Sequence, residues 1–257
     1  MARSHLFPSV TVDYPSSDGQ PMAETDFQRK PLTYAVDALG VYFQDREDVY
    51  VSGNLFIYYE EGNPQAVVAP DVFVVVGAVK RDRSSYLLWQ EPKGPDFVIE
   101  ITSRSTRSAD QGPKRGTYAF LGVEEYWQYD PTGDYLVPAL QGFRLEGDHY
   151  VQMAATALSE SDVSLHSRVL GLELRLEQGQ FRFYDPGTQQ PLFSLQEAEQ
   201  ARLAAEQAQL AAEQAQLAAE QARQQSEEQA RHEAAARQAA EDRIAELEAR
   251  LREQQDR

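Results

Sequence analysis

Two acidic side chains that flank apolar segments are the best candidates for chemistry in this sequence. Asp71 follows Pro70 and directly precedes the apolar run 72–76, and Glu100 lies near the end of a second apolar run, 97–101. Continuous apolar runs are typical of strands buried on both faces. If these strands pair antiparallel, the start of the first lies beside the end of the second, and the two acids meet at one sheet edge. Buried carboxylates are costly unless a cation neutralises them, and oxygen ligands of this kind suit Mg²⁺ or Mn²⁺.

The two acids alone also have an ordinary interpretation, because an Asp after Pro often shapes a turn and a strand-end Glu is often solvated. The residues that follow Glu100 favour chemistry instead. Four basic and four hydroxyl side chains stand within fifteen positions of it: Thr102, Ser103, Arg104, Ser105, Thr106, Arg107, Lys114 and Arg115. Such a rim would bind backbone phosphates while a metal polarises the scissile group. Lys80, Arg81 and Arg83 could extend the rim, although all these bases could equally balance an acidic surface.

The elements that must position these residues indicate an α+β fold. We expect a helix from about residue 26 to 43, with Pro31 either in its first turn or breaking it. Strands are expected at 49–52 and 55–60, joined as a hairpin through Gly53 and Asn54.

Further along the chain, a helix over 110–121 is expected to link the strand 97–101 to another strand at 126–130, in a crossover unit of the sheet. Gly147-Asp148 and Gln178-Gly179 predict two later hairpins.

The same residues carry a family resemblance. The motifs, in order, are Pro70-Asp71, the segment 97–106, Asp110, Lys114, Tyr118, the segment 122–127 and Asp130-Pro131. This set resembles the Uma-two family, which is abundant in bacteria and described as restriction endonucleases with the PD-(D/E)xK nuclease fold. The resemblance covers roughly residues 20 to 190. It implies a mixed β-sheet flanked by helices and metal-dependent hydrolysis of DNA.

Carried over by position, the resemblance makes Asp71 and Glu100 the metal ligands, with the backbone carbonyl of Ile101 as a third. The lysine expected two residues after the glutamate is absent, because Thr102 stands there. In this family its role moves to the following helix, which points to Lys114. That lysine would orient or help deprotonate the attacking water, or stabilise charge on the phosphate. Lys114 could also be an ordinary surface lysine.

The remaining conspicuous residues near the site have structural interpretations. We expect Asp110 to cap the helix, with a smaller chance of touching the site. Tyr118, Tyr126 and Trp127 are expected to fill the core rather than stack on bases.

Composition sets limits on the whole chain. The 257 residues include 41 acids and 24 bases, for a net charge of −17, and no cysteine. The absence of cysteine excludes disulfides, thiol nucleophiles and Cys-ligated metals. The acidic excess argues against indiscriminate wrapping of nucleic acid, but it allows a local basic groove. No signal pattern or membrane-length apolar run is present, so we expect a soluble cytoplasmic protein.

The C-terminal part has a different character from the rest. We divide the chain into an extension (1–20), a nuclease-like domain (21–190) and a helical tail (191–257). In the tail a seven-residue unit of Ala, Glu, Gln and Leu recurs, which predicts a long helix and a coiled coil. Its seam is either a line of alanines or the line Leu203, Leu210, Leu217. A solvated single helix is the alternative to a coiled-coil dimer.

Three functions are compatible with these observations. The first is a Mg²⁺-dependent endonuclease acting on DNA, for which a dimer would suit double-strand cleavage because two sites can address two strands. The second is an inactive nuclease-like scaffold or DNA-binding module whose tail recruits partners, favoured by the missing lysine and the acidic charge. The third is a hydrolase of another phosphodiester, which would use the same residues.

Overall fold

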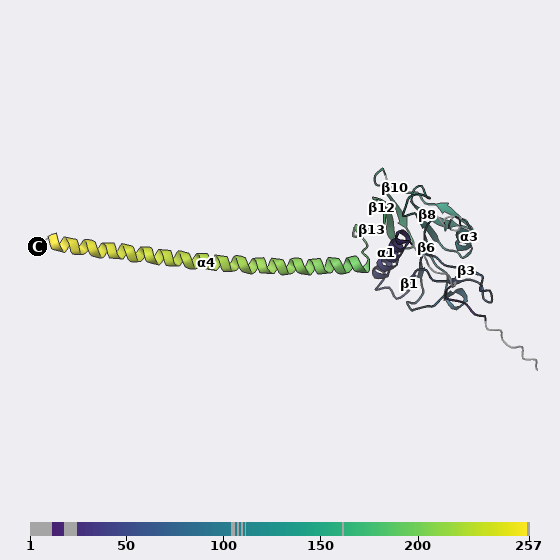
Figure 1. The fold of residues 1–257 in the computed structure, drawn as a ribbon, viewed down its shortest axis with the longest axis horizontal. Coiled ribbons are helices and arrows are strands. Elements are labelled where there is room, and N and C mark those ends of the chain that lie inside the picture. Colours follow the sequence, from purple (N-terminus) through teal and green to yellow (C-terminus); the bar gives the residue numbers. More distant parts are fainter. Residues whose placement is uncertain are drawn as a thin grey trace, which may run out of the picture. The chain divides into compact units, whose positions relative to one another are not determined.

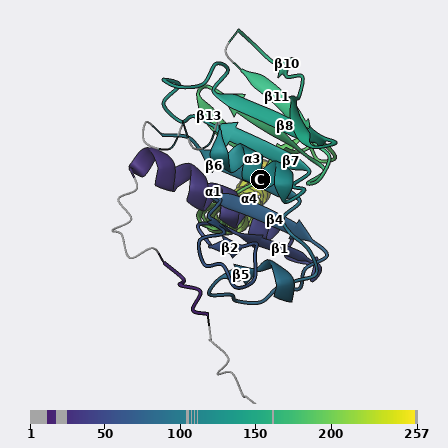
Figure 2. The same cartoon turned by 90° about the vertical axis from the view of Figure 1, so that its right-hand side faces the viewer.

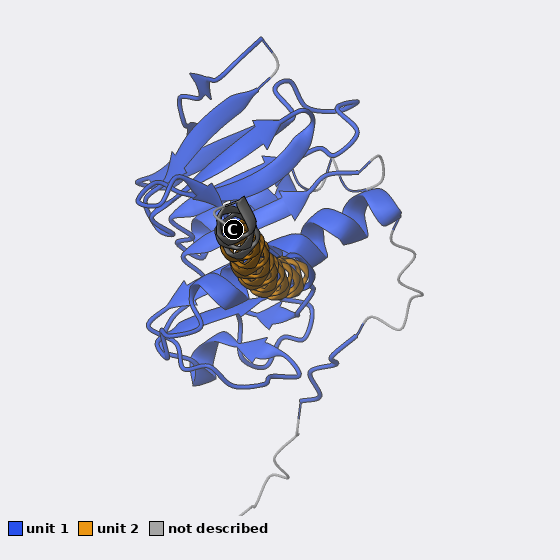
Figure 3. Cartoon of the chain, turned by 90° about the vertical axis from the view of Figure 1, so that its left-hand side faces the viewer, with its two compact units in different colours: residues 1–197 blue, residues 198–257 orange. Residues whose placement is uncertain are grey.

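The computed structural model describes residues 12–17, 25–103, 106, 108, 110, 112–160 and 162–255, with side chains described up to residue 245. The chain divides into two compact units, residues 1–197 and 198–257 (Figure 3). The first unit is α+β, as predicted, and the second is helical.

A six-stranded mixed sheet forms the centre of the first unit (Figures 1 and 2). Its strands, in spatial order, are β1 (Val49–Ser52), β4 (Val72–Val76), β6 (Phe97–Ile101), β7 (Glu125–Tyr129), β8 (Leu140–Glu146) and β9 (His149–Gln152). Of these neighbouring pairs only β6 and β7 are parallel, and α3 (Pro113–Phe120) connects them. The antiparallel pairing of β4 with β6 and the strand–helix–strand unit are therefore confirmed.

Two smaller sheets complete the unit. One contains β10 (Thr156–Ala157), β11 (Val163–Ser167), β12 (Leu172–Glu177), β13 (Gln180–Asp185) and β14 (Gln190–Pro191). The other contains β3 (Val67–Val68), β2 (Ile57–Tyr58) and β5 (Tyr86–Leu87), which continues into a 3-10 turn, η1 (Leu88–Gln90). The two later hairpins are confirmed, since β8 pairs with β9 and β12 with β13 across the predicted turns.

The central sheet is buried on both faces, which explains why its middle strands are continuously apolar. On one face, α1 (Asp26–Tyr42) and the five-stranded sheet cover alternate residues such as Val74, Ile99 and Trp127. On the other face, α3 and the three-stranded sheet cover Phe73, Val98 and their neighbours. The fold is thus a mixed sheet flanked by helices and smaller sheets.

Two local predictions were wrong. The segment 55–60 is not the hairpin partner of β1, because β1 pairs with β4 and the short β2 belongs to another sheet. Burial decides this pairing, since β1 gains two covered faces by lying beside β4. Pro31 neither starts nor breaks α1, which continues through it. The helix lacks only one hydrogen bond there, close to its exposed N-terminus.

Gly53 allows the strand that carries Asp71 to begin where it does. The chain crosses the start of β4 at this point, and the amide of Asn54 donates to the carbonyl of Pro70 at 3.0 Å. A Cβ at position 53 would lie 2.4 Å from the carbonyl oxygen of Asp71 and 3.0 Å from a methyl of Val36. A side chain at position 53 would therefore force the backbone at Asp71 to move, which costs free energy.

We therefore expect Gly53→Ala to lower the free energy of unfolding by about 2 kcal/mol through steric overlap. Denaturant titration would measure the loss. Gly116→Ala is the matched control, because a Cβ added there on α3 would meet no atom within 4 Å and alanine favours helix by about 1 kcal/mol. Equal stability of the Gly53→Ala protein and the natural protein would show that the crossing is not tight.

The second unit belongs to a single helix, α4 (Leu195–Gln255), of 61 residues. At 1.5 Å per residue it is about 90 Å long. Pairs one turn apart line it, such as Arg223 with Glu227 at 3.4 Å and Arg237 with Glu241 at 3.4 Å. The predicted long helix is confirmed. Of the helices in the described part of the chain, none has the length and apolarity to cross a membrane.

A candidate metal centre at the edge of the central sheet

The two predicted carboxylates meet where β4 begins and β6 ends. The register places Val72 opposite Ile99, so one step further Asp71 lies opposite Glu100. The Ile101 amide donates to Oδ2 of Asp71 at 2.6 Å, which fixes that carboxylate against the end of β6. Because side chains alternate along a strand, Asp71 and Glu100 both point to the face that α3 covers.

Helix α3 brings two polar side chains onto Glu100. Nζ of Lys114 lies 2.8 Å from Oε2, and the hydroxyl of Tyr118 donates to Oε1 at 2.5 Å. Positions four apart lie on the same face of a helix, so one turn of α3 holds both oxygens of the glutamate. The prediction that Tyr118 is buried holds, but its hydroxyl also contacts the site.

Asp110 is a third acid in this cluster. Its carboxylate is buried, and Oδ1 lies 3.3 Å from Nζ of Lys114, in a looser contact than a hydrogen bond. The prediction that Asp110 caps the helix was wrong: the N-cap of α3 is Gly112, which makes no side-chain cap bond. Instead the carbonyl of Asp110 accepts from the hydroxyl of Tyr126 at 2.7 Å, which ties this segment to β7.

Burial and the repulsion of neighbouring acids raise the pKa of Asp71 and of Glu100. Burial raises the pKa of Asp71 to about 6, against the opposing effects of Lys114 and the Ile101 amide. Burial and then the charge of Asp71 raise the pKa of Glu100 well above its usual range. An acid in this state releases its proton when a cation arrives to stabilise the charge.

Lys114 is held as an ammonium. Burial alone would lower the pKa of its amine, but the carboxylates of Glu100, Asp110 and Asp71 outweigh burial and raise it. A lysine in this state donates hydrogen bonds and carries positive charge, and it does not accept a proton. Of the predicted roles, orienting a water and stabilising negative charge on a phosphate both suit a protonated lysine.

The cluster fits a divalent cation in charge and in donor type. With all groups ionised, three acids face one ammonium, so two negative charges lack a partner. Both oxygens of Asp110 and the hydroxyl of Thr102 are buried without a hydrogen bond within the described residues. Oxygen donors of this kind suit Mg²⁺ or Mn²⁺. Among the described residues no group of three or more acids or histidines is arranged to hold a metal ion, so a cation here would need main-chain oxygen and water as further ligands.

The predicted phosphate-binding rim is only partly described. Arg104, Ser105 and Arg107 lie outside the described residues. The hydroxyls of Ser103 and Thr106 lie 3.1 Å apart in a turn that follows β6.

Arg115 lies beside Lys114 in sequence but is held against β8 and β9. Its guanidinium stacks 4.1 Å from the Phe143 ring centre and donates to the carbonyl of Tyr150 at 3.0 Å.

Lys80 and Arg81 do not join the cluster. They follow the C-terminal end of β4, whereas Asp71 precedes its N-terminal end, a separation of about 15 Å along the strand. Nζ of Lys80 donates to the carbonyls of Phe43 and Gln44, and Arg81 pairs with Glu91 at 2.6 Å. The physical reason is strand direction. The loop that joins β4 to β6 leaves the C-terminal end of β4, whereas Asp71 and Glu100 lie at the other end of the two strands.

Gln128 was not anticipated from the sequence. Gln128 on β7 is the register partner of Glu100 on β6, and its side chain is buried. Its Nε2 has no hydrogen-bond partner within the described residues. The signal was available: a single polar residue between Trp127 and Tyr129 in a buried strand needs a polar neighbour. The short spacing of Asp110 and Lys114, two opposite charges four residues apart, was a similar signal for an ion pair.

Similarity to known proteins extends over most of the first unit. The sequence model of the family Uma2, described as "Putative restriction endonuclease", matches residues 7–177. A crystal structure from Anabaena variabilis, described as a putative nuclease belonging to DUF820, is 13% identical and covers 52% of this chain and 71% of its own, with a TM-score of 0.36. No curated protein gives a significant match.

Proposed function

Because the chain belongs to the Uma2 family of restriction-endonuclease-like proteins, we propose that it is a Mg²⁺-dependent endonuclease that hydrolyses phosphodiester bonds of DNA. The observation that carries the proposal is the buried cluster in which Asp71 and Glu100 lie side by side beneath Lys114. A protein that needed this region only for packing would gain nothing from two unneutralised negative charges.

In this proposal Asp71, Glu100 and the carbonyl of Ile101 hold Mg²⁺ or Mn²⁺. A bound divalent ion polarises the scissile phosphate and lowers the pKa of the attacking water. The ammonium of Lys114 stabilises negative charge on the phosphate as the water oxygen adds to phosphorus and a P–O bond of the backbone breaks. Tyr118 fixes the orientation of Glu100 through its hydrogen bond.

Backbone phosphates are proposed to lie along the segment that follows β6 and along α3, where Arg104, Arg107 and Arg115 stand. We leave Lys80 and Arg81 out of this surface because they lie beyond the opposite end of β4 from Asp71.

The second candidate is an inactive nuclease-like scaffold or DNA-binding module. The threonine at position 102, where a lysine is expected after Glu100, favours it. Hydrolysis of a different phosphodiester is a third candidate, which a screen of substrates would separate from the first. Metal binding separates the first two candidates, because a scaffold has no need of a divalent ion.

Metal affinity should depend on pH in a defined direction. The pKa of Asp71 is raised to about 6 and that of Glu100 lies well above its usual range, so in acid a metal ion must displace protons from these carboxyls. We expect the affinity for Mn²⁺, measured by titration calorimetry, to rise as the pH increases from about 5 to about 8, with release of protons on binding.

The matched control for this titration is Asp71→Asn, in which the affinity should be low and its dependence on pH weaker. Failure of the natural protein to bind Mn²⁺ at any of these pH values would support the scaffold instead.

We also propose that α4 pairs with α4 of a second copy as a coiled coil. Leu203, Leu210 and Leu217 recur every seven residues and are 44%, 56% and 61% exposed in the single chain. A line of leucines on a helix of this length is stable in water when a partner covers it.

Light scattering on the full chain tests the pairing. We expect the mass of a dimer for the natural protein, and a monomer after all three leucines are replaced by glutamine, because the apolar seam is lost. Replacing Gln209 and Gln216 by alanine is the control, because these positions lie outside the 3-4 spacing of the leucine seam, and it should leave the mass unchanged. A monomeric natural protein would identify α4 as a solitary helix.

A further inference from the structure

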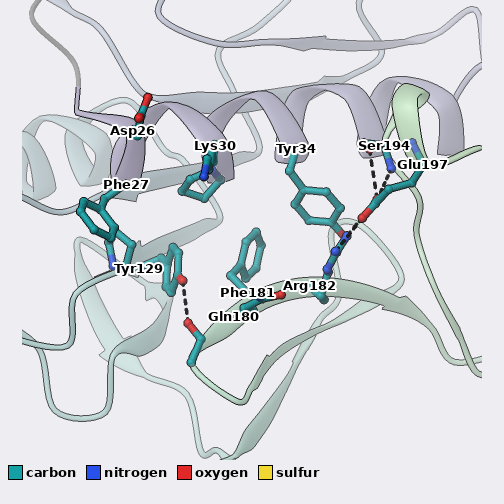
Figure 4. Close-up of a pocket in the computed structure, with 13 residues that line it drawn as sticks. Asp26, Phe27, Lys30, Tyr34, Tyr129, Gln180, Phe181, Arg182, Ser194 and Glu197 are labelled. Atoms are coloured by element: carbon teal, nitrogen blue, oxygen red, sulfur yellow. Dashed lines mark hydrogen bonds and ion pairs between the residues drawn. The ribbon is translucent and has the colours of Figure 1, made fainter. Parts of the chain in front are cut away.

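A pocket of about 360 Å³ lies beside α1 (Figure 4). Tyr129, which lines it, belongs to the face of the central sheet that α1 covers, whereas the candidate metal centre lies on the face that α3 covers. The pocket is formed where α1 approaches the end of β7 and the start of β13. Its size is at the lower end of the range for small-ligand sites, roughly 300–1,000 Å³. Every lining residue belongs to the first compact unit.

The pocket is a slot with aromatic side chains on two sides. Phe27 and Tyr34 descend from one face of α1, and Tyr129 and Phe181 rise from the strands opposite (Figure 4). The strand side is rigid, because the rings of Tyr129 and Phe181 pack 5.4 Å apart and the hydroxyl of Tyr129 donates to the carbonyl of Gly179 at 3.0 Å.

Phe27 differs from the other aromatic residues that line the pocket, because 65% of its surface is exposed. An exposed phenylalanine at the mouth of an aromatic slot presents an open face on which a flat ring can stack.

One positive charge of the pocket remains available. Arg182 is paired with Glu197 at 2.6 Å, and Asp26 is paired with Arg29 at 2.8 Å, so these acids are neutralised. Lys30, one turn of α1 after Phe27, has neither an ion pair nor a hydrogen bond within the described residues. The pocket therefore offers aromatic faces and a free ammonium, which is the combination that recognises a nucleobase together with its phosphate.

The position of the pocket relates it to the metal centre. Tyr129 is the register partner of Ile101, whose amide holds Asp71. Neighbouring strands lie ~4.8 Å apart and packed layers ~10 Å apart, so the pocket and the carboxylates are separated by on the order of 10–15 Å around the sheet edge. At ~3.4 Å per nucleotide, this corresponds to roughly three to five nucleotides of one strand.

We propose that this pocket binds an unpaired base of the DNA strand that crosses the sheet edge, with Phe27 stacking on the base and Lys30 contacting an adjacent phosphate. The inference deepens the proposed nuclease function and rests on it for the identity of the ligand. Phe181 and Arg182 lie beyond the residues that the family model matches, so part of the pocket is a feature of this chain outside the matched region.

The test measures binding separately from cleavage. The probe is a single-stranded oligodeoxynucleotide containing 2-aminopurine, whose fluorescence falls on stacking, with Ca²⁺ in place of Mg²⁺. We expect the natural protein to quench the fluorescence. Phe27→Ala should weaken binding about tenfold and remove the quenching, because one stacked base is lost. Lys30→Gln should weaken binding and make it less sensitive to salt.

Two comparisons make the result specific. Tyr42→Ala removes a partly exposed aromatic ring at the far end of the same helix, outside the pocket, and should bind as the natural protein does. A fully paired hairpin duplex should be much less sensitive to Phe27→Ala than the single strand.

Unchanged affinity and quenching in the Phe27→Ala protein, or equal losses for the hairpin and the single strand, would overturn the inference. Failure of the natural protein to cleave DNA with Mg²⁺ or Mn²⁺ would instead overturn the proposed nuclease function, and it would leave this binding result as it stands.

Discussion

Replacement of Asp71 by asparagine or Glu100 by glutamine is expected to reduce Mg²⁺-dependent cleavage of plasmid DNA about 100- to 1,000-fold. The magnitude follows from the loss of charge stabilisation in a buried site, where a single group is worth roughly 10²–10³ in rate. Each substitution keeps the shape of the side chain and removes the charge that would bind the metal. Conversion of supercoiled plasmid to nicked and linear forms measures the rate.

The fold should survive both substitutions. The pKa of each acid is raised, so its charged form costs stability in the metal-free folded protein, and an uncharged amide of the same shape removes that cost. Because the folded pKa of Asp71 exceeds its unfolded value of about 4, its charge costs stability as the pH rises towards 6 and above. Asp71→Asn should therefore unfold at the same temperature as the natural protein, or higher, in EDTA at neutral pH.

Asp96→Asn is the matched control for activity. Asp96 directly precedes β6, at the other end of the strand from Glu100, and accepts from the amide of Val76 at 2.8 Å. Its replacement should leave cleavage intact. Plasmid nicking by the Asp71→Asn and Glu100→Gln proteins at the natural rate would remove the metal-centre mechanism altogether.

Lys114→Met is expected to cause the largest loss of stability, about 3 kcal/mol at neutral pH without metal. The substitution leaves Glu100 and Asp110, whose side chains are 0% and 1% exposed, without their shared cation. Breaking a buried pair by removing one partner typically costs about 3–5 kcal/mol, because the remaining charge is stranded. Urea denaturation monitored by circular dichroism measures the difference.

The pH dependence identifies the cause of this loss. At about pH 4.5 the carboxyls of Asp71 and Glu100 are protonated in the folded state, so Lys114 has little negative charge to neutralise. The loss of stability caused by Lys114→Met should therefore be smaller at pH 4.5 than at neutral pH. Mg²⁺ should restore part of the stability at neutral pH, because it supplies positive charge to the same oxygens.

Lys93→Met is the control for the loss of an amine as such. Lys93 pairs with Asp96 at the surface and is 46% exposed, so its replacement should cost less than about 1 kcal/mol. A loss of equal size for the two variants, unaffected by pH or Mg²⁺, would show that Lys114 contributes packing rather than charge.

The predictions that succeeded from sequence depend on short-range physics. The apolar runs 72–76 and 97–101 are strands with the expected bounds, because continuous burial on two faces leaves a pattern that can be read locally. Antiparallel pairing then places Asp71 opposite Glu100. The heptad repeat similarly determines the helix Leu195–Gln255, since helix propensity acts within a few residues.

Other features depend on which elements meet in space. The pairing of β1 with β4 rather than with 55–60, and the distance of Lys80 from the cluster, follow from the assembled sheet. The protonation of Lys114 depends on three acids that are brought together by β4, β6 and the segment before α3. Desolvation and charge act through space and not along the chain, so the sequence determined the residues and strands of the site, and only the tertiary structure decided their charges and partners.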